Sequence, residues 1–150
     1  MKRKIICTAL FLAVCLCLVL VTAHYQIVVV SGNSMFPTYK DGDILVMSRD
    51  PGNIRAGDVI AFSGRSGDLV KRVAAVCGDI VEYDAPGGTV SVNGEVTASF
   101  TGEPAGRKKT YSIPEGSYFV LGDNLEESID SRYEEVGIVR KDETKGVIHY

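Results

Sequence analysis

The sequence is short of the side chains that most often build metal sites and disulfide frameworks. It has two histidines, His24 and His149, and four cysteines, of which only Cys77 lies beyond residue 23. One cysteine cannot close a disulfide within residues 24–150, which also contain no C-x-x-C pair and no histidine cluster. These absences argue against a metal site, and we expect neither a metal nor a cofactor.

The sequence also lacks a cluster of basic residues outside its N-terminus. Residues 24–150 hold 13 of the 16 Lys and Arg residues and all 19 Asp and Glu residues, a formal charge of −6. Proteins that bind nucleic acid meet the phosphates with clustered Lys and Arg, and no basic stripe or run is present here. Nucleic acid is therefore not an expected partner.

One long apolar run is present, at the N-terminus. Residues 5–23 carry no charge and follow the basic residues KRK. A helix of this length reaches roughly 28 Å, close to the ~30 Å hydrocarbon core of a bilayer. Because basic flanks stay in the cytoplasm, the run predicts a single-pass anchor with residues 1–4 inside and residues 24–150 outside. A cleavable signal peptide is the alternative, although its apolar region usually spans only about 7–15 residues.

Residues 24–150 read as short β segments separated by Gly, Pro, Asn and Asp. Strands are expected at residues 26–30, 43–47, 58–62, 69–76, 79–83, 89–92, 95–97, 117–121 and 146–149. Asn93-Gly94 between alternating residues is a strong hairpin signal, and residues 97–110 predict a long polar loop. The absence of a long helical period favours a mainly β, antiparallel, barrel-like domain.

A candidate nucleophile lies in the stretch VVVSGNSMFPT, where an apolar run meets a polar turn containing Ser31 and Ser34. A serine hydroxyl is a weak nucleophile until a neighbouring base takes its proton. His24 adjoins the apolar run and His149 is next to the last residue, so neither has a site-like context. The alternative base is a lysine kept neutral by burial, which costs about 1.4 kcal/mol per unit of pKa depression.

Lys71 is the lysine best placed for such burial. It lies in the apolar stretch GDLVKRVAAV, where strand alternation places Lys71 on one face and Arg72 on the other. The other lysines of residues 24–150 lie in a turn, in the polar loop or near the C-terminus. Charges on both faces also fit an edge strand that resists aggregation, so this second interpretation stays open.

Several blocks in order make the sequence resemble a known family. They are SGNSMFPT with DGDILVMSR, AGDVIAF, LVKRVAAVCGDIVE, VNGE, IPEGSYFVLGDN and SIDSR. Behind a basic-flanked anchor, they resemble the bacterial type I signal peptidases, membrane-bound Ser/Lys endopeptidases that remove signal peptides from exported preproteins. The resemblance spans residues 26–148 and implies a signal-peptidase-like β fold, related to the LexA type, in the bacterial cell membrane. The short segment between residues 81 and 117 implies a compact, Gram-positive-like form.

The resemblance implies roles for the residues around the turn and the strand. Ser34 matches the family nucleophile and Lys71 its general base, while Met35 and Pro37 match residues that shape the turn. The backbone N–H of Ser34 would hold the developing oxyanion. A second oxyanion donor, a serine in some members, is replaced here by Gly32.

The last block matches residues that support the site. Ser128 matches a serine that orients the lysine, and Asp130 with Arg132 matches a bracing pair held by bidentate hydrogen bonds. A surface ion pair worth little is the alternative interpretation. Leu125 stands where the family usually has arginine, which makes the fit of Ser128 less direct than that of the nucleophile.

Family substrates carry small residues, typically alanine, at the first and third positions before the cut. Shallow apolar pockets would select them, and we expect their walls to include Ile27, Val29 and Val73. An extended substrate would add as a strand beside the strands of the site.

Three other classes of protein fit the sequence less well. Self-cleaving LexA-type proteins share a Ser/Lys pair but are soluble, whereas this chain carries an apolar span. An inactive homologue that assembles pili or secretion complexes would be expected to lose Ser34 or Lys71, and both are present. An anchored binding domain would not explain the serine turn, the strand lysine and the Asp-Ser-Arg turn together.

Overall fold

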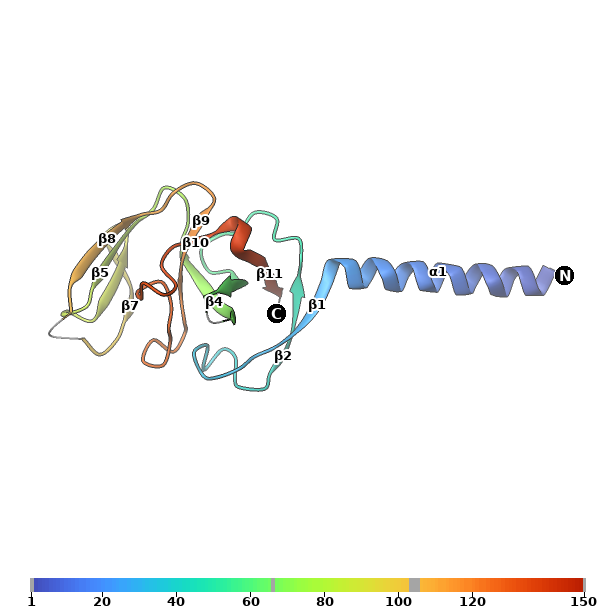
Figure 1. Cartoon of the computed structure of the whole chain (residues 1–150), viewed down its shortest axis with the longest axis horizontal. Coiled ribbons are helices and arrows are strands. Elements are labelled where there is room, and N and C mark those ends of the chain that lie inside the picture. The colour runs from blue at the N-terminus through green and yellow to red at the C-terminus, as the bar shows by residue number, and fades with distance from the viewer. Residues whose placement is uncertain (1, 66, 103–105, 150) are drawn as a thin grey trace.

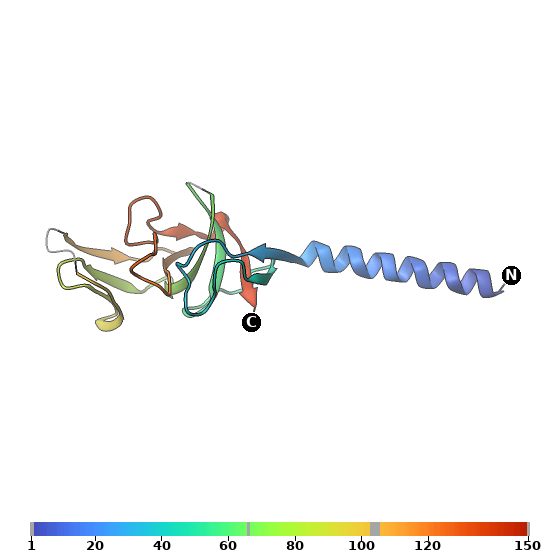
Figure 2. The same ribbon diagram turned by 90° about the horizontal axis from the view of Figure 1, so that it is seen from below.

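The computed structural model describes residues 2–65, 67–102 and 106–149. One long helix projects from a β domain made of two antiparallel sheets, and the smaller sheet lies at the end opposite the helix (Figures 1 and 2). The chain is therefore mainly β with one N-terminal helix, as the sequence predicts.

Helix α1, Lys2–His24, contains the apolar run and its basic flank. By length and composition its stretch Ile6–His24 is able to cross a bilayer, and none of that stretch is buried inside the protein. Leu10, Phe11 and Leu16 are all exposed. A helix that is apolar on every side and contacts no protein core is typical of a membrane span.

Seven strands form the larger sheet, in the order β1-β2-β11-β3-β4-β9-β10. Their bounds are β1 Tyr25–Val29, β2 Ile44–Ser48, β11 Thr144–His149, β3 Val59–Gly64, β4 Gly67–Ala75, β9 Ser117–Leu121 and β10 Val139–Arg140. Every neighbouring pair is antiparallel, so β1 and β4 run in the same direction. Because β4 is an inner strand, the edge-strand interpretation of its two cations is wrong.

The smaller sheet has the order β7-β6-β5-β8. Its bounds are β5 Ile80–Asp84, β6 Thr89–Val92, β7 Glu95–Ser99 and β8 Lys108–Ser112. Asn93 and Gly94 both have positive φ, 53° and 83°, which suits a tight hairpin turn between β6 and β7.

The loop predicted at residues 97–110 is partly wrong. Strand β7 continues to Ser99 and β8 begins at Lys108, while residues 103–105 lie outside the described residues. Strand β8 could not be predicted from its own residues, because lysine is depleted in strands. In the structure Lys108 of β8 is paired with Asp84 of β5 at 2.7 Å, which favours the strand. The short strand β10 and the 3-10 turn η1, Lys141–Glu143, were also not predicted.

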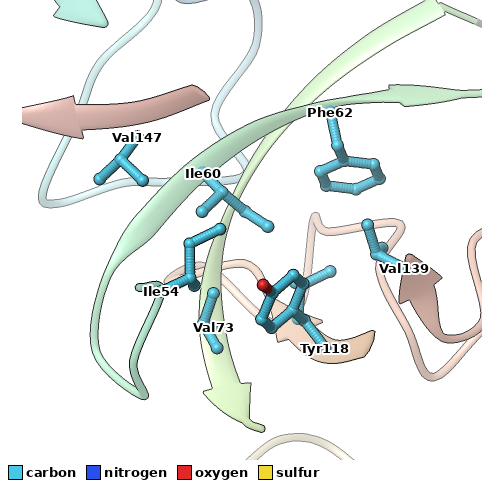
Figure 3. Packing of buried hydrophobic residues seen from close by; sticks show 8 residues of the cluster. Ile54, Ile60, Phe62, Val73, Tyr118, Val139 and Val147 are labelled. Carbon is cyan, nitrogen blue, oxygen red and sulfur yellow. The ribbon is translucent and has the colours of Figure 1, made fainter. Parts of the chain in front are cut away.

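The core beneath the larger sheet holds β4 in place. Phe62, Val73 and Tyr118, from β3, β4 and β9, pack together in the cluster of Figure 3. Each such side chain stabilises the fold by about 1.5–3 kcal/mol relative to full exposure. Strand β4 therefore enters the candidate site from a rigid support.

Candidate active site

The turn after β1 presents Ser34 at the surface while its neighbour is buried. Met35 is buried against Met47 and Ala61 in a second apolar cluster. The turn is closed by the Phe36 amide, which donates to Asn33 O at 3.0 Å, and the Ser34 carbonyl accepts from the Asn124 amide at 3.0 Å. The following bond to Pro37 is cis. These contacts fix the direction of the Ser34 side chain.

Lys71 meets Ser34 from the middle of β4. Its Nζ atom lies 2.6 Å from Ser34 Oγ, across 37 residues of sequence. Lys71 is only 3% exposed, and the buried positions Lys71, Val73 and Ala75 alternate with less buried neighbours along the strand. The structure thus brings the two predicted residues into direct contact.

Burial alters the acid–base chemistry of this lysine. Desolvation lowers the pKa of Lys71 from its ordinary value, and the carboxylates of Asp130 and Asp123 oppose this effect without cancelling it. A lowered pKa increases the fraction of neutral amine near neutral pH. A neutral amine in contact with a hydroxyl is able to take its proton, as a general base must.

Asp130 and Arg132 form a buried brace behind the pair. The Arg132 Nε and Nη2 atoms donate to the two Asp130 carboxylate oxygens at 2.8 and 3.0 Å. Asp130 is 0% exposed and Arg132 4%, so the surface-pair interpretation is wrong. Arg132 also donates to Leu125 O at 2.7 Å, and Asp130 accepts from the Gly122 amide at 3.0 Å. One ion pair therefore ties the loop after β9 to the end of that strand.

Ser128 is buried on this loop, but it does not make the hydrogen bond to the lysine that an orienting role would use. Its hydroxyl has no hydrogen-bond partner among the described residues. It lies against Gly122, where an added Cβ would meet Ser128 Oγ and lie 2.5 Å from Ser34 O. Gly122, which belongs to the GDN block but has no role predicted from the sequence, is thus the residue that lets the loop approach the turn.

Arg72 and Asp123 form a second pair that was not predicted from the sequence. Arg72 donates to both Asp123 oxygens, at 2.8 and 2.7 Å, and to Gly57 O at 2.8 Å. Burial acts to raise the pKa of Asp123, but hydrogen bonds from Arg72 and Thr38 lower it overall. Asp123 is therefore ionised at neutral pH. Two features of the sequence could have indicated this pair: Arg72 follows Lys71 directly, and Asp123 is the acidic residue of the GDN block.

A cavity of about 310 Å³ opens over the Ser34–Lys71 pair. Because the sheet curves, β1 and β4 both line it, and Ile27 and Val29 are among its walls. Val73, predicted as a third wall, does not line it and is 1% exposed within the core. The reason is that the Val73 side chain packs in the core cluster that contains Phe62 and Tyr118.

The backbone amides of the turn differ in whether they have an acceptor. The Gly32 amide, at φ 83°, donates to Asp41 Oδ1 at 2.8 Å. No hydrogen bond from the Ser34 amide is formed within the described part of the chain. A free amide on the same residue as the Ser34 hydroxyl is suited to bind an oxyanion.

The two histidines do not line this cavity. His24 ends α1, where its Nδ1 atom lies 3.0 Å from Leu20 O, and His149 is exposed near the end of β11. Among the residues that the structure describes, no group of three His, Cys, Asp or Glu side chains is placed to hold a metal ion.

Comparisons with known proteins identify the family of the chain. A family model described as "Signal peptidase, peptidase S26" matches residues 3–150. Signal peptidase IB of Staphylococcus aureus (strain COL) is 30% identical over 176 residues, covering 100% of this chain and 90% of the relative. Signal peptidase I of Bacillus caldolyticus is 32% identical over 160 residues, covering 93% and 86%.

A solved structure is similar as well. The crystal structure of a signal peptidase I from Enterococcus faecalis V583 matches with a TM-score of 0.50 and 28% identity, over 66% of this chain and 99% of that chain. The family predicted from the sequence blocks is thereby confirmed: this chain belongs to the signal peptidase family, peptidase S26.

Proposed function

We propose that this protein is a membrane-bound endopeptidase that removes signal peptides from exported preproteins with a Ser34–Lys71 dyad. The observation that carries the proposal is the 2.6 Å contact between Lys71 Nζ and Ser34 Oγ, with the lysine almost fully buried. Met35 and Pro37 shape the turn that presents the nucleophile. Asp130 and Arg132 brace the loop that backs it.

The chemistry proceeds in two stages. Neutral Lys71 takes the proton of Ser34 Oγ as this oxygen attacks the carbonyl carbon of the scissile peptide bond. The Ser34 amide binds the oxyanion, and the C–N bond then breaks as the Lys71 ammonium protonates the leaving amine. Lys71, neutral again, takes a proton from water as this water attacks the acyl ester. The ester C–O bond then breaks, the Lys71 ammonium returns the proton to Ser34 Oγ, and the signal peptide leaves with a carboxylate end.

The substrate lies extended between β1 and β4. These strands run in the same direction along the cavity. Among the described strands, β1 pairs with β2 alone and residues 68–71 of β4 pair with β3 alone, so each offers backbone groups to a third strand. Exposed Ile27 and Val29 wall the space next to Ser34. A cavity this narrow favours small residues at the first and third positions before the cut.

The anchor sets the location of the reaction. Residues 5–23 span the bilayer, residues 1–4 stay in the cytoplasm with their basic charges, and residues 24–150 form the catalytic domain outside. The partners of this domain are the bilayer and exported preproteins, and neither a metal nor a nucleic acid takes part.

Cleavage of a preprotein tests the proposal. Detergent-solubilised wild type should cut a preprotein with an Ala-x-Ala site after the second alanine, and Ser34→Ala should cut at least about 10³-fold more slowly. The same preprotein with leucine in place of that alanine should resist cleavage. If wild type leaves several preproteins intact, the alternative of an inactive homologue that serves assembly takes first place.

The pH profile of cleavage tests the role of the lysine. The rate should rise with pH through the pKa of Lys71, since only the neutral amine accepts a proton. Asp123→Asn removes a carboxylate that raises this pKa and leaves Arg72 unbalanced, so both changes move the acidic limb of kcat/KM to lower pH. Asp84→Asn, which removes the same charge beside Lys108, is the control and should not move the limb. A limb that moves to higher pH contradicts the assignment.

A further inference from the structure

A second groove begins beside the dyad and does not take part in the chemistry above. Its first part is a cavity of about 550 Å³ lined by Arg72, which follows Lys71, and by Gly122, which backs the Ser34 carbonyl. None of its lining residues lines the cavity over the dyad. The two cavities therefore have separate walls, and the first part of the second groove reaches the Ser34 turn through Gly122.

The groove continues along the smaller sheet. An adjoining cavity of about 610 Å³ shares Ala56, Ala74 and Thr97 with the first one and reaches Val96. The shared walls are small side chains, which leave room for a chain to pass. Together the two cavities extend from Gly122, which contacts the Ser34 turn, along β7 toward the β6–β7 turn, and we call this the β7 groove.

Strand β7 offers an open edge to this groove. It is the terminal strand of the smaller sheet, and no described strand pairs with its outer side. Val96 on β7 is 57% exposed. Unpaired backbone groups on an edge strand beside an exposed apolar side chain are the features that accept an added peptide strand.

We propose that the β7 groove binds the first residues of the mature protein, those that follow the scissile bond, as an extended strand along β7. This inference rests on the proposed function. A preprotein whose signal-peptide end occupies the cavity between β1 and β4 must leave the dyad on another side, and the β7 groove is a cavity that begins there. In every turnover the preprotein brings such a segment, the start of its mature part, to the enzyme.

The chemistry of the groove suits a main chain rather than a particular side chain. Arg72 and Asp123 at its start are paired with each other and so present no net charge. Half of the other residues that line this first cavity are Ala or Gly, and the rest are Thr, Val or Leu. Recognition through the backbone tolerates many sequences, as an enzyme that releases different mature proteins requires.

Substrate length combined with a blocking variant tests the proposal. One peptide carries about ten residues after the cut, enough to span roughly 33 Å when extended, and the other carries only two. For wild type, kcat/KM should be at least about tenfold higher for the long peptide, an advantage equal to about 1.4 kcal/mol. Ala56→Trp fills the part of the groove that both cavities share, and should bring the ratio of long to short close to one.

Ser112→Trp is the matched control, because it adds the same bulk at an exposed position of β8, on the opposite edge of the same sheet. It should keep the wild-type ratio. If Ala56→Trp fails to cut even the short peptide, Thr97→Tyr on β7 replaces it and should also lower the ratio. A ratio near one for wild type, or an unchanged ratio in the blocking variant, overturns the proposal. If wild type cuts neither peptide, the proposed function itself fails.

Discussion

Replacing Lys71 with methionine is expected to abolish cleavage while leaving the thermal unfolding midpoint unchanged or higher. Loss of a dyad base removes the group that activates the serine, so kcat should fall by at least about 10³-fold. The free energy of unfolding should rise, because an amine that is 3% exposed is costly to desolvate. Methionine fills a similar volume without a charge. If Lys71 is buried for function at a cost in stability, its replacement should lower activity and leave stability unchanged or higher.

The measurements are kcat on an Ala-x-Ala peptide and thermal unfolding followed by circular dichroism. Lys109→Met is the control, since Lys109 lies on β8 and contacts Glu134 at 3.3 Å far from the dyad cavity. It should change neither quantity appreciably. Cleavage by Lys71→Met within tenfold of wild type would show that another group acts as base, and His24 and His149 would then be substituted in turn.

Substitution of Asp130 by alanine should destabilise the domain far more than removal of an exposed charge does. It leaves the Arg132 guanidinium buried without its carboxylate, which typically costs about 3–5 kcal/mol. The Gly122 amide also loses its acceptor, at about 1–3 kcal/mol. At roughly 2–4 °C per kcal/mol for a domain of this size, the unfolding midpoint should fall by more than about 10 °C.

Urea unfolding of the domain measures this loss directly. Asp142→Ala is the matched control, because Asp142 pairs with Arg140 at 3.1 Å on the exposed surface and should contribute less than about 1 kcal/mol. Asp130→Asn should fall between the two, since the amide oxygen still accepts from Gly122. A loss below about 1 kcal/mol for Asp130→Ala would mean that the brace does not hold the loop.

Most of the fold could be predicted from local patterns. Each of the nine predicted strands overlaps a strand of the structure, because alternation and turn residues act over a few neighbouring positions. Strand β8 was missed because its lysines are poor strand formers and it is stabilised by Asp84 from another strand. The two-residue strand β10 carries too little pattern to be seen.

The site was predictable in part for the same reason. Ser34 lies in a short turn motif, and Lys71 is conspicuous as a cation within an apolar strand. Arg72–Asp123 and the packing of Gly122 against Ser128 depend on partners distant in sequence, so no local pattern reports them. Val73 was misplaced because alternation gives the face of a strand but not which neighbour covers it.

By itself the sequence determined the apolar N-terminal run, the β class, the serine turn and the family blocks, all of which depend on adjacent residues. Tertiary structure alone decided that Lys71 lies 2.6 Å from Ser34, that Asp130 and Arg132 are buried, and that a second groove follows β7. Whether a side chain is buried, and which distant residue it contacts, depend on how the seven strands of the larger sheet curve and pack. The desolvation that lowers the pKa of Lys71 arises only when the folded sheet buries its amine.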